Sequence, residues 1–129
     1  MITFERANVA HMGDLLFNRR HPVVDRPAGA SMRNWAIVLE KTAADHNNDT
    51  TYICGHAGGQ FPVIVGRADL MHFRDYLTAL LEFVQGQIKA GKTQAEITAI
   101  REPLPNFPDH GALTASILGN AFGEVSEGR

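Results

Sequence analysis

The longest regular pattern in the chain lies between residues 69 and 90, where apolar side chains recur every three or four positions. This spacing places them on one face of an α-helix, with the intervening polar residues on the opposite face. Gly91 is typical of the residue that follows the end of such a helix. The members of the apolar stripe are Leu70, Phe73, Leu77, Leu80, Leu81, Val84 and Ile88.

A second helix is predicted after Ser31, a residue type that caps helix N-termini. Its apolar stripe, with the same spacing, consists of Trp35, Val38, Leu39 and Thr42. Two shorter helices are also expected. One is opened by the capping box in residues 93–96 and runs to about residue 100, and the last covers about residues 112–122.

Two β-strands are predicted near the N-terminus, because residues 2–5 and 9–12 flank a short turn in which Asn8 is able to take a positive φ. The second strand is expected to end at residues 13–14, and residues 15–17 form a short buried continuation. The start of the chain therefore predicts a hairpin at one end of a small sheet.

Residues 18–30 contain two prolines and a glycine, and they predict an irregular loop. Residues 51–54 are β-prone and predict a third strand, which delivers Gly55 and His56 at its C-terminal end. Because two amphipathic helices must cover the sheet, we expect a set of apolar side chains to be almost fully buried. They are Trp35, Leu39, Ile53, Phe73, Leu77, Leu80 and Leu81.

Composition indicates a single globular domain over residues 1–129. Hydrophobic residues make up 44% of the chain and charged residues 20%, which is not the balance of a disordered protein. The net charge is −2 and no long basic stripe occurs, so nucleic acid is not an expected partner.

The single cysteine, Cys54, excludes an internal disulfide and is expected to be a small buried hydrophobe. The sequence has no run of 18 apolar residues that would cross a membrane, and its polar start does not resemble a signal peptide. We therefore expect a cytoplasmic protein that has no membrane partner.

Two segments carry the side chains best suited to metal chemistry. The run Ala-His-Met-Gly-Asp-Leu-Leu-Phe over residues 10–17 presents Asp14 after a glycine, and Tyr-Ile-Cys-Gly-His-Ala-Gly-Gly over residues 52–59 presents His56 in the same way. In this order, and together with the proline-containing loop and the long helix, they resemble the C-terminal half of metallo-β-lactamase superfamily hydrolases. The resemblance covers about residues 1–108.

The resemblance implies an α/β fold that is half of an α/β/β/α sandwich, a small mixed β-sheet covered by helices on one face. It also implies that Asp14 bridges two metal ions, usually zinc, and that His56 binds the second ion. His21, in the loop after the Gly-Asp segment, is the candidate additional ligand. A bridging carboxylate holds two cations close together, and their combined field acidifies a bound water into a nucleophile. We expect the Asp14 and His56 side chains to lie within about 8 Å of each other.

The other metal loops of the superfamily have no counterpart in this chain. The family site opens with His-x-His-x-Asp-His, whereas no two of the six histidines here are spaced i, i+2. Two ligands are fewer than the three or four that hold zinc in protein sites. Simple structural roles, a turn cap for Asp14 and a backbone hydrogen bond for His56, are the alternative. His72 and His110 are expected to be surface or capping residues.

The resulting functional expectation is a truncated metallo-β-lactamase-like domain without hydrolase activity of its own, for which no catalytic residue is assigned. Its open sheet face would be apolar, so it is expected to associate, either as a homodimer or with a complementary N-terminal half. The alternative is a zinc-dependent hydrolase whose site is completed by another chain or by a missing N-terminal half. Its substrate would be a lactam, thioester, lactone or phosphodiester.

Overall fold

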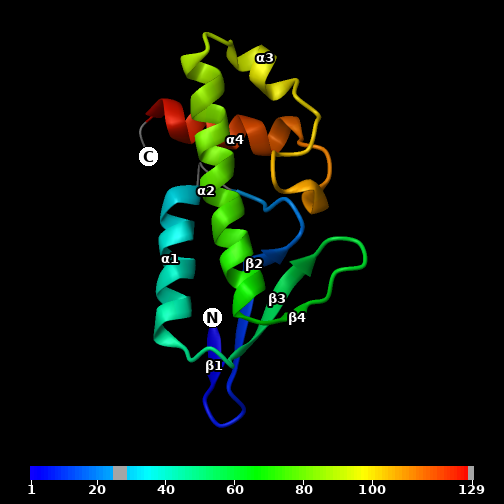
Figure 1. The fold of residues 1–129 in the computed structure, drawn as a ribbon. Coiled ribbons are helices and arrows are strands. Elements are labelled where there is room, and N and C mark those ends of the chain that lie inside the picture. The colour runs from blue at the N-terminus through cyan, green and yellow to red at the C-terminus, as the bar shows by residue number, and fades with distance from the viewer. Residues whose placement is uncertain (25–28, 128–129) are drawn as a thin grey trace.

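The sheet forms one layer of the structure. The longest helix packs on one of its faces with the first helix beside it, whereas the two C-terminal helices lie beyond the end of the sheet (Figure 1). The computed structural model describes residues 1–24 and 29–127. In these residues the sheet has the order β1-β2-β3-β4, in which β2 and β3 are parallel and both outer pairs are antiparallel. The predicted α/β class with a small mixed sheet is confirmed. The strands are β1 (Ile2–Phe4), β2 (Val9–Asn18), β3 (Thr51–Ala57) and β4 (Ile64–Val65).

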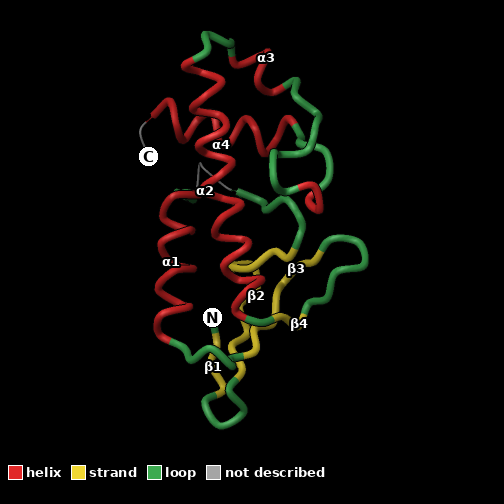
Figure 2. Tube along the Cα trace, in the orientation of Figure 1, coloured by secondary structure: helices red, strands yellow, loops and turns green. Residues whose placement is uncertain are grey.

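The long predicted helix is the centre of the helical layer. It packs on β2, β3 and β4, runs beside the first helix, and is crossed by the last helix near its C-terminal half (Figure 2). The predicted stripe is buried from Leu70 to Val84, and only Ile88 is partly exposed. The helical elements are α1 (Met32–Asp45), α2 (Arg67–Lys89), α3 (Gln94–Thr98), the 3-10 turn η2 (Pro108–His110) and α4 (Ala115–Glu127).

Local capping signals account for three helix boundaries, the starts of α1 and α3 and the end of α2. Ser31 caps α1 through its hydroxyl, which accepts a hydrogen bond from the backbone N–H of Asn34, and the predicted capping box opens α3. Gly91 follows α2 with φ +85°, as expected for a residue after a helix end. The last helix begins three residues later than predicted, because Ala112 is still paired with Pro103 in an isolated β-bridge.

A buried carboxylate completes the N-terminus of α1. Glu124 from α4 has no exposed surface, and its two oxygens accept hydrogen bonds from the backbone N–H groups of Met32 (2.7 Å) and Arg33 (2.8 Å). The Ser31 hydroxyl donates to the same side chain at 3.3 Å. These N–H groups have no partner within the helix itself, so Glu124 satisfies donors that would otherwise be buried and unpaired.

The second strand does not end at residues 13–14 as predicted. It continues to Asn18, and Gly13 adopts φ +54° at a shift in register, so that His11 pairs with Ile53 and Gly13 with Cys54. The glycine therefore marks a β-bulge inside one strand rather than its end. The predicted turn at Asn8, with φ +55°, is confirmed. The predicted loop is confirmed for residues 19–24 and 29–30, which contain no helix or strand, and its residues 25–28 lie outside the described residues.

Two of the residues expected in the core are only partly buried. Tyr52 and Cys54 face the helices, so Ile53 between them points to the opposite face of the sheet. Trp35 lies at the margin of the core, with its indole N–H donating to the Leu15 carbonyl at 2.8 Å. Val38, on the predicted stripe of α1, is 43% exposed. The other core predictions, Leu39, Phe73, Leu77, Leu80 and Leu81, are confirmed.

The face of the sheet away from the helices carries an apolar row. The pairing of strands aligns Ile2, His11, Ile53 and Ile64 across all four strands, and paired residues share a face. Ile2 is 61% exposed and Ile64 is 63% exposed, and Phe4 lies on the same face, because it pairs with Val9 two residues from His11. The short strand β4, which sequence reasoning did not predict, contributes one end of this row.

Candidate functional site

Asp14 and His56 lie next to each other on the parallel neighbours β2 and β3. His56 is near the C-terminal end of β3, whereas Asp14 lies inside β2, directly after the bulge at Gly13, and not in a loop at the end of the strand. His56 Nε2 and Asp14 Oδ1 are 3.0 Å apart, and the Asp14 side chain is 82% exposed. The predicted proximity of the two side chains is confirmed.

Glycine makes this close approach possible. A Cβ atom at position 55 would lie 2.5 Å from the Gly13 carbonyl oxygen and 2.7 Å from Asp14 Oδ1. The bulge at Gly13 and the missing side chain at Gly55 therefore allow the Asp14 carboxylate to lie directly over β3. The His56 ring is held by stacking on Phe17, with ring centroids 4.8 Å apart. The glycines of the Gly-Asp and Gly-His segments thus serve the same purpose, which is to let Asp14 approach His56 closely.

The structure does not bring His21 into this pair. Its Nδ1 lies 2.5 Å from the Tyr76 hydroxyl and its Nε2 lies 2.9 Å from the Ala112 carbonyl oxygen, so both ring nitrogens are engaged. Over residues 1–24 and 29–127, no group of three or more histidine, cysteine, aspartate or glutamate side chains is arranged to hold a metal ion. Asp14 and His56 thus supply two donors suited to zinc but not a complete zinc site, and metal binding by His21 stays a prediction.

A pocket of about 520 Å³ lies beyond the C-terminal ends of β2 and β3. This is the position at which ligands bind parallel α/β sheets, because loops from adjacent strands diverge there. Three segments that are distant in sequence form its walls. The lining residues are Arg19, Arg20, His21, Ala57, Gly58, Gly59, Gln60, Phe61, Asp109, His110 and Gly111.

Arg19 fixes one wall of the pocket. It adopts φ +55°, a conformation uncommon for residues other than glycine, directly after β2. Its guanidinium donates to Asp69 at 2.5 Å and to Asn18 at 2.9 Å, and it lies 5.6 Å from the ring centroid of Phe61. Arg19 is therefore held by neighbours from three elements, which is typical of a side chain that shapes a site.

His110, which also lines the pocket, belongs to a stack of rings. The His110 ring is parallel to that of Tyr76, with centroids 3.9 Å apart, and His72 stacks on His110 at 5.6 Å. Burial lowers the pKa of His110 to about 3, with the charges of His72, His21 and Arg19 acting in the same direction. The expectation that His110 lies at the surface is wrong, because η2 folds back over α2.

The buried histidine predicts a pH-dependent stability. His110 stays neutral in the folded chain down to about pH 3, whereas in the unfolded chain it takes up a proton below its ordinary pKa of 6.5. Protonation therefore favours unfolding as the pH falls through 6.5. Urea unfolding should show that the wild type loses roughly 3 kcal/mol more stability than the His110→Asn variant between pH 6.5 and about pH 4. Equal losses in the two proteins would refute this assignment.

Cys54 takes no part in either arrangement. It is buried in β3 under the helices, and burial raises the pKa of its thiol to about 11, so the thiolate needed for nucleophilic chemistry is disfavoured. The expected role of Cys54 as a small buried hydrophobe is confirmed.

No family model, curated protein or solved structure matches this chain. In the described part of the chain, no helix is both long enough and apolar enough to cross a membrane. The fold defines the class, a small mixed α/β protein with a four-stranded mixed sheet. The site consists of an exposed carboxylate–imidazole pair beside a pocket.

Proposed function

We propose that this chain is a metallo-β-lactamase-like half-domain that provides two ligands of a metal centre and is inactive as a hydrolase by itself. The observation that carries the proposal is the 3.0 Å contact between Asp14 and His56 on neighbouring parallel strands. An exposed carboxylate and imidazole at this separation suit a divalent ion such as zinc. The remaining ligands would come from the chain that packs on the open face of the sheet.

The open sheet face supports association with a second copy of the chain. Ile2, Phe4 and Ile64 are each more than half exposed there, and burying such a patch is favourable. A closed two-fold dimer is the commonest arrangement of identical chains. The Asp14 carboxylate lies over Gly55, which follows Ile53 at the end of this face, so a covering sheet would approach the pair directly. Two copies would supply four ligands, the number of a closed zinc site.

A zinc-dependent hydrolase completed by a different chain is the second candidate. The pair favours it in one respect, because Asp14 is 82% exposed and leaves room for further ligands and for a bound water. When bound, zinc would supply an acidified water as nucleophile. Asp14 and His56 would hold the ion, and the lactam, thioester, lactone or phosphodiester substrate would be selected by the partner as well as by this chain.

The proposal predicts a zinc-dependent change in stability together with a dimer mass. Light scattering at micromolar concentration should give a dimer, and zinc should raise the melting temperature of the wild type by several degrees, since ligand binding stabilises the folded state. Asp14→Asn should abolish the zinc effect, whereas Asp49→Asn, at an exposed position at the opposite end of β3, should retain it. Ile64→Lys should give a monomer.

The matched control for the last variant is Ile37→Lys, which changes an exposed side chain on α1, away from the open face. A monomeric wild type would refute the homodimer, and an unchanged melting temperature in zinc would refute the metal role. Zinc binding by a monomer that gains hydrolase activity only with a second protein would favour the second candidate over the first.

A further inference from the structure

The pocket beyond β2 and β3 contains buried polar atoms that have no hydrogen-bond partner among residues 1–24 and 29–127. It is built from residues other than Asp14 and His56, and its description requires neither a metal nor a covered sheet face. A buried donor or acceptor without a hydrogen bond is unfavourable, so such atoms on a pocket wall indicate a ligand that supplies the missing partner.

His110 is the strongest of these observations. The residue is only 7% exposed and lines the pocket, and neither of its ring nitrogens has a hydrogen-bond partner among the described residues. Tyr76 covers one face of the ring at 3.9 Å with an interplanar angle of 3°. The neutral ring offers one N–H donor and one acceptor nitrogen.

Arginine side chains supply the positive charge of the pocket. The Nε atom of Arg19 is buried and has no hydrogen-bond partner in the described part of the chain. The Asp109 carboxylate is 4.0 Å from it, beyond hydrogen-bond distance. Arg20 also lines the pocket, and within the described part of the chain no carboxylate pairs with it. The pocket thus contains one unpaired guanidinium and one unused N–H of a second.

We infer that this pocket binds a small organic molecule through an anionic carboxylate or phosphate group, which accepts hydrogen bonds from Arg20, from Arg19 Nε–H and from the His110 N–H. A volume of about 520 Å³ lies in the range of small-molecule sites. Charged hydrogen bonds from guanidinium groups to such oxygens are the strong ones in proteins. Asp109 also lines the pocket, and its carboxylate disfavours a ligand with a second negative charge. It can accept a hydrogen bond from a hydroxyl group of the ligand.

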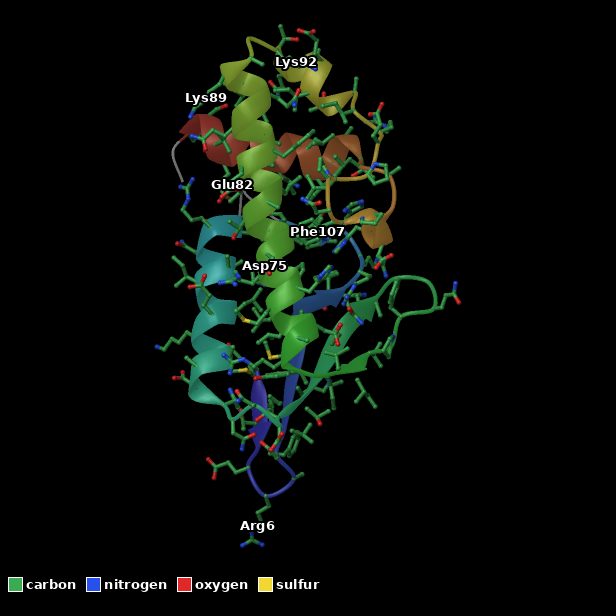
Figure 3. All side chains as sticks on the ribbon, viewed as in Figure 1. Arg6, Asp75, Glu82, Lys89, Lys92 and Phe107 are labelled. Carbon is green, nitrogen blue, oxygen red and sulfur yellow. The ribbon has the colours of Figure 1, made fainter. Side chains whose placement is uncertain are left out.

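The test uses the full chain freed of metal, with inorganic phosphate and acetate as separate probes followed by ¹⁵N NMR. Either probe should give saturable shifts at the amides of Gly58, Gly59 and Gly111, which lie on the pocket wall. Arg20→Gln should weaken binding about tenfold, the effect of one charged hydrogen bond. Arg6→Gln removes the same charge at the tip of the β1–β2 hairpin, far from the pocket, and should change affinity less than about twofold (Figure 3).

His110→Asn is a second variant, which changes no charge. It should weaken binding of the probe, and adding Arg20→Gln to it should weaken binding by the same factor as in the wild type. Saturation by only one probe would support the inference and identify the anionic group. The absence of saturable shifts with both probes, or equal effects of Arg20→Gln and Arg6→Gln, would overturn it. Because the protein is metal-free, this outcome is independent of zinc binding at Asp14 and His56.

Discussion

Replacing Glu124 by alanine should lower the free energy of unfolding by about 4 kcal/mol, because it leaves buried backbone donors at the start of α1 without acceptors. The carboxylate accepts from the backbone N–H groups of Met32 and Arg33 and has no exposed surface, so water does not replace it. Glu124→Gln keeps one carbonyl oxygen and should lose about half as much. Urea unfolding monitored by circular dichroism measures both losses.

Glu82→Ala is the matched control. Glu82 is exposed on α2 and points away from the core, so its loss should change stability by no more than about 0.5 kcal/mol (Figure 3). If Glu124→Ala were no more destabilising than Glu82→Ala, the cap would contribute nothing to stability.

Replacing Gly55 by alanine should destabilise the chain by about 3 kcal/mol and separate Asp14 from His56. The new methyl group would lie 2.5 Å from the carbonyl oxygen of Gly13, which belongs to the neighbouring strand and is held in the ladder. Relief requires β2 and β3 to move apart at the bulge. Chemical denaturation gives the loss of stability, and the NMR chemical shifts of the His56 ring report the change at the site.

Gly86→Ala is the comparison for this variant, because nothing lies within 4 Å of a Cβ atom added at that position of α2. It should raise stability by up to about 1 kcal/mol, as alanine favours a helix over glycine. Similar effects of the two substitutions would mean that the strands tolerate a side chain at position 55, and the close approach would then not restrict the site.

Helical periodicity predicts α2 and its buried residues correctly, because a helix repeats its buried face over many residues. The α2 stripe has members over five turns, so a single misassigned residue does not change the result. The run over residues 51–54 offers no such redundancy, since nearly every member is apolar and alternation cannot show which residues face the helices. The sequence therefore places Ile53 in the core together with Cys54 and leaves Tyr52 out, whereas Tyr52 and Cys54 are the buried residues.

The carboxylate–imidazole pair was predictable because each residue follows a glycine at a β-prone run, and the family resemblance places the two together. The pocket was not predictable, because its walls come from segments near residues 20, 59 and 110. Nothing in the local pattern around His110 indicates that η2 folds over α2, and Glu124 likewise resembles an ordinary polar residue of a terminal helix. Contacts between distant segments of this kind are fixed by packing rather than by local periodicity.

The Glu124 cap has a consequence for how the chain is made. α1 is synthesised before α4, yet the acceptor for its first N–H groups lies 92 residues further along the chain. Until α4 has been synthesised, the start of α1 must rely on Ser31 and water. This helix is thus completed only after α4 has formed, and a nascent chain that stops before residue 124 should expose a frayed α1 to proteases.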